Sequence, residues 1–156
     1  MCIRDRPDNI SSNTSSVTLY HTTHTNFNTK IINISGKTKE YFMLENIGHG
    51  GYQAGLDYII GGNDNTSGIA IWHIDDNQSG NNDYNHKLVD LEEAADAGLD
   101  LGTHSGKQTN LFFSGNKTEF SDSTDPNSKT YSGTSSGITI DNISAAGDSM
   151  TFDVTF

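Results

Sequence analysis

Residues that favour turns and loops make up more than half of this chain. Gly, Ser, Thr, Asn and Asp together account for 81 of its 156 residues. Asp, Asn and Ser form hydrogen bonds with nearby backbone groups in turns, and Gly weakens a helix interior, so long helices are disfavoured. Only 32% of the residues are hydrophobic, so material for a core is sparse. The composition therefore excludes an all-helical bundle and predicts a loop-rich, mainly β protein.

The chain is also strongly acidic, with 20 Asp and Glu residues against 9 Lys and Arg and a net charge of -11. This balance offers no electrostatic basis for binding nucleic acid or an anionic membrane surface, so neither is expected as a partner. No apolar run reaches the roughly 18 residues that a membrane-spanning helix needs, so membrane insertion is not expected. Acidic chains rich in Asp and Asn suit hard cations or uncharged polar ligands, and solubility outside the cell explains the acidity equally well.

The first residues differ in character from the rest. Residues 1–6 resemble a cloning or sequence-assembly scar, and residues 7–16 are predicted to be a frayed tail. The charged start is not followed by the apolar stretch of a signal peptide. The single cysteine, Cys2, cannot form an internal disulfide and does not indicate a redox compartment. One β-rich domain is expected over residues 17–156.

Short apolar or alternating runs, separated by Gly, Asn, Asp and Ser clusters, predict the strands of this domain. Strands are expected at residues 17–20, 30–34, 40–45, 69–74, 137–140 and 149–156, the third of them central and buried on both faces. Gly147 and Asp148 predict a hairpin between the last two strands. Residues 88–99 fit a strand and a short helix equally well, because they include a Glu-Glu-Ala-Ala run. The expected fold is an antiparallel β-sandwich or barrel-like domain with long loops and at most one or two short helices.

One polar loop has the spacing of a calcium site. It follows the apolar run at residues 69–74, and its oxygen-bearing residues are Asp75, Asn77, Ser79, Asn81 and Asp83. In calcium loops alternate residues turn inward, and a Gly at the sixth position, here Gly80, permits the bend. The twelfth position is His86 instead of a bidentate Glu, and no helix is expected beside it, so the loop is not an EF-hand. Two interpretations remain open, a calcium loop closed by a distant carboxylate and an ordinary solvated hairpin loop.

No catalytic group of residues stands out, and no catalytic residue is assigned. The chain has no Gly-rich phosphate loop, no Gly-x-Ser-x-Gly elbow and no His-Glu-x-x-His zinc helix. Trp72 and His73 are adjacent in a predicted strand and must therefore lie on opposite faces. His73 shares its face with Asp75, which favours a structural hydrogen bond to the imidazole.

Three blocks in order carry a resemblance to a known family. They read EYFMLEN at residues 40–46, GIAIWHID at 68–75 and LVDLEEA at 88–94, and Asp96 follows the third. Together they resemble the region behind the catalytic helix in secreted bacterial metallopeptidases of the immune inhibitor A family. The segments at residues 125–128, 136–138, 141–144 and 150–154 look like the closing strands of that family. The chain departs from the family at Ile47 and Gly48, where Arg-Gln is expected, and in a longer loop before Gly68.

The resemblance implies a secreted zinc endopeptidase as the parent protein, with its zinc-binding helix upstream of this chain. The expected role is then a non-catalytic C-terminal β-rich part that supports the protease domain, with the loop at residues 75–83 as its candidate calcium site. Its partners would be the upstream protease domain of the same chain and, through it, the protein substrates of the parent. Zinc would belong to the catalytic domain. The resemblance assigns a polar framework role to Glu45, His73, Asp75, Glu93 and Asp96.

A second class of function fits the same composition. The chain would then be a calcium-dependent carbohydrate-binding or adhesion module of a secreted protein. Trp72, Tyr84 and Tyr131 are its candidate stacking surfaces, because aromatic rings can pack on the apolar face of a sugar. A self-sufficient hydrolase is the least supported alternative, since no acid, base and nucleophile group themselves in the sequence.

Overall fold

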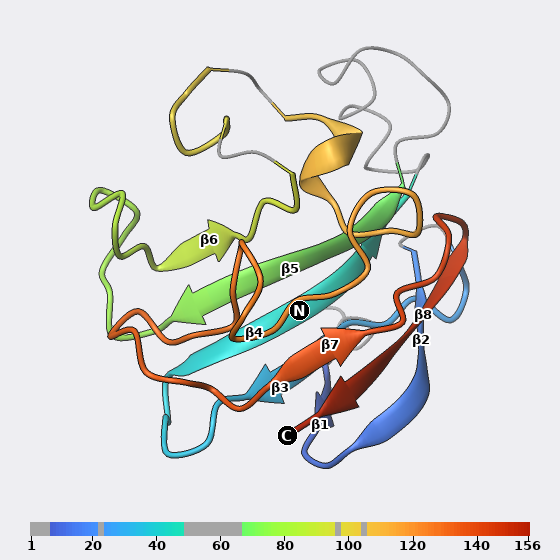
Figure 1. The fold of residues 1–156 in the computed structure, drawn as a ribbon, viewed down its shortest axis with the longest axis horizontal. Coiled ribbons are helices and arrows are strands. Elements are labelled where there is room, and N and C mark those ends of the chain that lie inside the picture. The colour runs from blue at the N-terminus through green and yellow to red at the C-terminus, as the bar shows by residue number, and fades with distance from the viewer. Residues whose placement is uncertain (1–6, 22–23, 49–66, 96–97, 104–105) are drawn as a thin grey trace.

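In a computed structural model the chain forms two β-sheets packed face to face (Figure 1). The structure describes residues 7–21, 24–48, 67–95, 98–103 and 106–156. The larger sheet has the strand order β1-β3-β4-β5-β6, and the smaller has the order β2-β8-β7. The mainly β class and its sandwich form are therefore confirmed. Within the described residues the helical content is one short 3-10 turn, η3 (Gln108–Asn110), and no helix there could cross a membrane.

The strands are β1 (Asp8–Ile10), β2 (Thr14–Tyr20), β3 (Lys30–Asn33), β4 (Glu40–Ile47), β5 (Gly68–Asp75), β6 (Val89–Leu91), β7 (Thr139–Asp141) and β8 (Ser149–Thr155). All neighbouring pairs are antiparallel except β1 and β3, which are parallel. The predicted pairing of the last two strands is confirmed, since β7 pairs with β8. In the segment that fitted strand and helix equally, the described residues form a strand at Val89–Leu91, bends at residues 94–95 and a turn from residue 98.

The central strand β4 shows why the two faces of the larger sheet differ. Its residues alternate between buried and half-buried, as the period of two in a strand requires. Phe42 and Leu44 lie in the core with residues of the smaller sheet, whereas Met43 and Glu45 lie half-buried on the outer face. The prediction of a central strand is confirmed, but only its inner face is fully buried.

The frayed tail predicted for residues 7–16 is wrong over most of its length. Residues 8–10 form β1, which pairs with β3, and β2 already begins at Thr14. Ile10 explains why this segment forms a strand and not a frayed tail, because its side chain is buried in the core and anchors the segment. The polar residues around Ile10 concealed that anchor in the sequence. The residues interpreted as a scar, 1–6, lie outside the described residues.

The smaller sheet covers only part of the larger one, and the irregular segment 111–138 covers much of the rest (Figure 1). Phe112 and Phe120 of this segment pack edge to face, with ring centroids 5.8 Å apart, and Phe120 packs in the same way on Phe42 at 5.2 Å. Backbone bridges join Phe112 to Ile69 and Phe120 to Ile140. Near the start of β4 and the end of β5, the inner face therefore lies beneath a loop and not beneath a strand.

Candidate functional site: a buried histidine cluster

A buried polar cluster lies where β4 begins and β5 ends. Glu40 is the first residue of β4 and pairs in register with Asp75, the last residue of β5. His73 lies two residues before Asp75, so both side chains point to the inner face. The His73 side chain is only 3% exposed, and those of Glu40 and Asp75 are also buried. The His73 cluster is defined here as Glu40, His73, Asp75, His86, Glu92 and Tyr131.

Both ring nitrogens of His73 face carboxylates. Its Nε2 lies 3.1 Å from Glu40 Oε1, and its Nδ1 lies 3.1 Å from Glu92 Oε1. Burial raises the pKa of Glu92, although its hydrogen bond with His73 opposes that rise. Both ring nitrogens of His73 are therefore engaged within the protein, so neither is free to act as a metal ligand or a general base.

Tyr131 attaches the irregular segment 111–138, which covers the inner face of the larger sheet here, to this cluster. Its ring stacks between those of His73 and His86, with centroids 4.2 Å away on each side. Its backbone N–H donates to Glu40 Oε1 at 2.7 Å. Burial, followed by the negative charges of Asp90 and Glu92, raises the pKa of Tyr131 well above its ordinary value. The Tyr131 ring is thus already enclosed, which removes one of the three aromatic surfaces considered for sugar stacking.

The first residue of the predicted calcium loop belongs to the same cluster. Asp75 Oδ2 lies 2.7 Å from His86 Nε2, and Asp75 Oδ1 accepts hydrogen bonds from the backbone and side-chain nitrogens of Asn77. Burial alone would raise the pKa of Asp75, but the hydrogen bonds from Asn77 and His86 bring it below its ordinary value. Both carboxylate oxygens of Asp75 are therefore engaged within the protein.

The other predicted calcium ligands also hold the loop together. The side-chain amide of Asn81 bonds to both the N–H and the C=O of Val89. Asp83 accepts a hydrogen bond from the backbone N–H of Asn85, and Ser79 is exposed. Over the described residues, no group of three or more His, Cys, Asp or Glu side chains is arranged so that it could hold a metal ion. Calcium binding by this loop stays a prediction.

The predicted framework residues lie in different places. Glu45 is on the outer face, where it accepts a hydrogen bond from Trp72 Nε1 at 2.9 Å, and burial raises the pKa of Glu45. Glu93 is buried and accepts hydrogen bonds from the backbone N–H groups of Leu99 and Asp100 and from the Asn110 amide. Asp96 lies outside the described residues. The structure thus brings His73 and Asp75 into one cluster but places Glu45 and Glu93 in two others.

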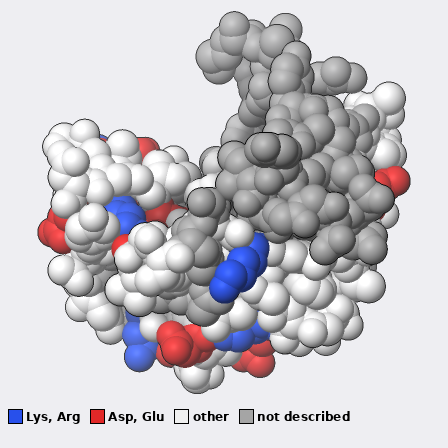
Figure 2. Space-filling view, turned by 90° about the horizontal axis from the view of Figure 1, so that it is seen from above, with Lys and Arg blue, Asp and Glu red and all other residues white. Residues whose placement is uncertain are grey.

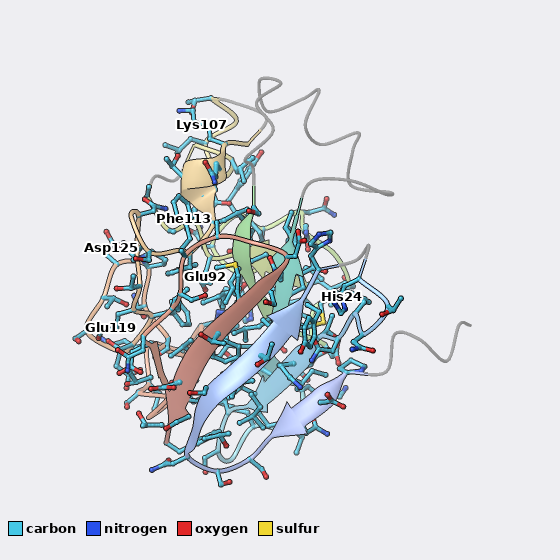
Figure 3. The ribbon with its side chains drawn as sticks, turned by 90° about the vertical axis from the view of Figure 1, so that its right-hand side faces the viewer. His24, Glu92, Lys107, Phe113, Glu119 and Asp125 are labelled. Atoms are coloured by element: carbon cyan, nitrogen blue, oxygen red, sulfur yellow. The ribbon has the colours of Figure 1, made fainter. Side chains whose placement is uncertain are left out.

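Two members of the cluster carry roles that the sequence did not indicate. Glu40 and Tyr131 are 91 positions apart in the chain, and Tyr131 belongs to a loop without periodicity. The inward position of Glu40 could have been found from the alternation of β4, which places it on the same face as Phe42 and Leu44. Glu92 lies near the middle of the molecule, while Glu119 and Asp125 lie on its outer loops (Figure 3).

The cluster borders an open hollow of about 400 Å³, lined by His73, Glu92 and the loop from Asp125 to Gly133. Because the polar atoms of His73 are already paired, the arrangement suits a structural anchor better than acid–base catalysis.

On the face seen from above, charged side chains of both signs are scattered among uncharged ones in the part drawn in colour (Figure 2). No family model, curated protein or solved structure matches this chain.

Proposed function

We propose that this chain is the non-catalytic β-rich part of a secreted bacterial zinc metalloendopeptidase of the immune inhibitor A family, and that it supports the protease domain. The observation that carries the proposal is the way the three resembling blocks meet. They contain β4, β5 and β6, which are adjacent strands of one sheet. Glu40, His73 and Glu92 come from one block each and share the buried hydrogen bonds described above. That juxtaposition supports reading the three blocks as one unit.

The outer face of the larger sheet is consistent with the proposed role of supporting the protease domain. Ile31, Met43, Trp72 and Leu91 pair in register across β3, β4, β5 and β6, so they form one apolar row. All four side chains are half-buried. A continuous apolar row on a sheet face is the kind of surface that a neighbouring domain covers. We assign this row as the contact with the upstream protease domain, where the zinc and the cleavage chemistry would reside.

A zymogram tests whether the cleavage activity belongs to the upstream protease domain and not to this chain. Residues 1–156 alone should not clear casein, with or without a chelator, because the catalytic groups are assigned to the upstream domain. Chelator-sensitive clearing by this chain would overturn the proposal. The genomic sequence upstream of Asp8 gives a second test, since the proposal requires an in-frame His-Glu-x-x-His motif there and its absence would contradict the proposed family.

The calcium loop has a separate test, because its ligands are occupied internally. Calcium would have to replace His86 and Asn77 as partners of Asp75. If it does so, about 1 mM calcium should raise the melting temperature, since a ligand that binds only the folded state stabilises it by mass action. Asp83→Asn should reduce that rise. An unchanged melting temperature would exclude calcium binding while leaving the supporting role intact.

A further inference from the structure

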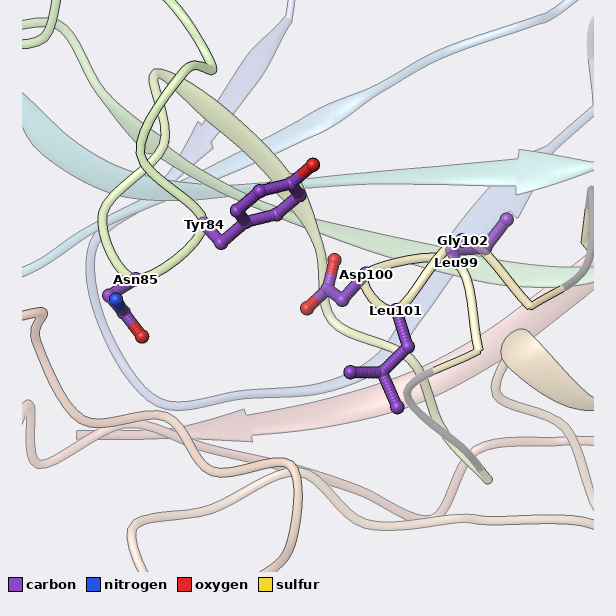
Figure 4. Close-up of a pocket in the computed structure, with 6 residues that line it drawn as sticks. All are labelled: Tyr84, Asn85, Leu99, Asp100, Leu101 and Gly102. Atoms are coloured by element: carbon purple, nitrogen blue, oxygen red, sulfur yellow. The ribbon is translucent and has the colours of Figure 1, made fainter.

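A second hollow, of about 650 Å³, opens between two loops at the β6 side of the molecule (Figure 4). One wall consists of Tyr84 and Asn85, from the loop that follows β5. The other wall is the turn at residues 99–102. Tyr84 and Leu101 lie on either side of the Asp100 carboxylate (Figure 4). The volume is within the range of about 300–1,000 Å³ that is usual for small-molecule sites.

The two walls are held in place by buried contacts beneath them. The Lys87 ammonium donates to Asp90 at 2.6 Å and also to Asp100, and so links the Tyr84 loop to the opposite turn. Glu93 accepts hydrogen bonds from the backbone N–H groups of Leu99 and Asp100, each at 3.1 Å. Because these anchors are internal, the hollow is formed before any ligand arrives.

The rim of the hollow exposes two large apolar side chains. Tyr84 is 74% exposed and Leu101 is 75% exposed, the highest values for large hydrophobic residues in the described part of the chain. A single exposed apolar residue needs no explanation, but two that flank one preformed hollow indicate a binding surface. Among the aromatic residues considered for sugar stacking, Tyr131 is enclosed and Trp72 is half-buried and bonded to Glu45. Of these three residues, Tyr84 alone presents an exposed ring.

The polar groups of the hollow indicate what kind of ligand would fit. Lys87 is shared between the carboxylates of Asp90 and Asp100, so the site has no surplus positive charge for an anion. The Asn85 amide and the remaining Asp100 oxygen can donate to and accept from paired hydroxyl groups. The Tyr84 ring can pack on the apolar C–H face of a sugar ring. We propose that this hollow binds a neutral oligosaccharide.

A peptide ligand fits less well. Extended peptides commonly bind by adding a strand to a sheet edge, where they use free backbone N–H and C=O groups. The edge strand beside the hollow is β6, and the Asn81 side chain already occupies both backbone groups of Val89. The glycan proposal does not depend on the proposed protease-supporting role, and either can fail without the other.

The test is a titration of the folded chain, followed by two-dimensional NMR, with cellotetraose, chitotetraose and xylotetraose as probes. At least one should bind with a dissociation constant of about 0.1–10 mM, as suits an open site. The signals that move should be those of Tyr84, Asn85 and residues 99–102. Tyr84→Ala should weaken binding by about tenfold or more, whereas Tyr84→Phe, which keeps the ring, should bind like the wild type.

The matched control is Phe156→Ala, which removes another exposed ring at the end of the smaller sheet and should leave binding unchanged. Tyr84→Ala should keep the wild-type melting temperature, because the side chain is mostly exposed. The proposal is overturned if none of the three probes binds, if the shifts map elsewhere, or if Tyr84→Ala binds like the wild type. Binding of an apolar peptide at the hollow without any glycan binding would instead assign it to protein docking.

Discussion

At the scale of single residues, Asp122 shows how a carboxylate can organise a loop in a chain with few apolar residues. It accepts hydrogen bonds from the side chains of Ser128 and Ser135 and from the backbone N–H groups of Ser136 and Gly137. These bonds close the loop that carries Tyr131 onto the His73 cluster. Burial alone would raise the pKa of Asp122, but the hydrogen bonds, chiefly those from Ser135 and Ser136, hold it below the ordinary value of 3.8.

Asp122→Asn should therefore destabilise the fold by about 1–2 kcal/mol at neutral pH, because an amide nitrogen would face hydrogen-bond donors. A lowered folded pKa contributes stability above pH 3.8 that is lost as the pH falls through the folded value. The difference between wild type and variant should thus shrink in acid. Urea denaturation at neutral pH and near pH 3 measures both effects. A pH-independent difference would contradict the assigned role of the charge.

At the scale of secondary-structure elements, two asparagine side chains form hydrogen bonds with backbone groups of edge strands, on the side where no neighbouring strand lies. The Asn28 amide bonds to the N–H of Tyr20 and the C=O of Thr18 on β2, which is an edge strand. Asn81 makes the same pair of bonds to Val89 on the edge strand β6. Exposed strand edges invite pairing with other chains, so these amides protect the sandwich from aggregation.

Asn81→Ala should free the backbone groups of Val89 at the β6 edge. We expect a loss of about 1 kcal/mol in stability and a greater tendency to self-associate, because the edge becomes available for pairing. The neighbouring variant Asn82→Ala is the matched control, since Asn82 is also exposed in the same loop. Light scattering and melting temperature compare the two. Equal self-association of both variants would show that the hydrogen bonds from Asn81 to Val89 do not protect the β6 edge.

The outer face of the larger sheet gives a prediction about pH. Burial raises the pKa of Glu45 above its ordinary value of 4.5, and its hydrogen bond from Trp72 only partly opposes this. A raised folded pKa contributes stability below pH 4.5 that is lost as the pH rises through the folded value. Glu45→Gln keeps an oxygen for Trp72 but carries no charge. It should be more stable than the wild type at neutral pH and similar to it at about pH 4.

Denaturant titrations at the two pH values check the Glu45 prediction. Glu119→Gln is the control, because it also removes one negative charge but lies at an exposed position (Figure 3). If both variants gain equally at neutral pH, the gain comes from the lower net charge of the whole chain and not from the buried position of Glu45.

At the scale of the whole molecule, the polar side chain of Asn46 joins the two sheets in addition to the apolar core. Asn46 of β4 is fully buried, and its amide donates to the C=O of Gly147 at 2.9 Å and to the C=O of Leu19 at 3.4 Å. Leu19 belongs to β2, and Gly147 lies just before β8. The Asn46 Oδ1 has no partner among the described residues, but another alignment of the sheets would also leave the two bonds from its Nδ2 unmade, so this side chain favours the observed alignment.

Asn46→Ala should lower the free energy of unfolding by about 1–3 kcal/mol, since the carbonyl groups of Leu19 and Gly147 both lose a donor. Asn33→Ala is the matched control, because Asn33 is an exposed residue of the adjacent strand β3 and its loss should be nearly neutral. Guanidinium denaturation measures both variants. A cost for Asn46→Ala no larger than that of the control would show that the sheets are aligned by the apolar core alone.

Much of the sheet could be predicted because its signals are local. The alternation of apolar and polar residues in β8 follows from the period of two in a strand. The apolar content of β4 and β5 is equally visible in the residues of each segment. The buried anchor Ile10 could not be predicted in this way, since one apolar residue among polar ones has no period. Nor could the calcium spacing at Asp75–Asp83 reveal that side-chain oxygens of Asp75, Asn81 and Asp83 are engaged by His86, Asn77, Val89 and Asn85.

The sequence by itself determined the mainly β class, the central strands and the opposite faces of Trp72 and His73. Each of these follows from composition and short-range periodicity. Only the tertiary structure decided which polar side chains meet. Glu40, His73, Glu92 and Tyr131 come from four separate segments, and their contacts depend on strand order and on a loop whose path carries no periodic signal. Most buried polar groups in folded proteins are paired, and the fold as a whole chooses their partners.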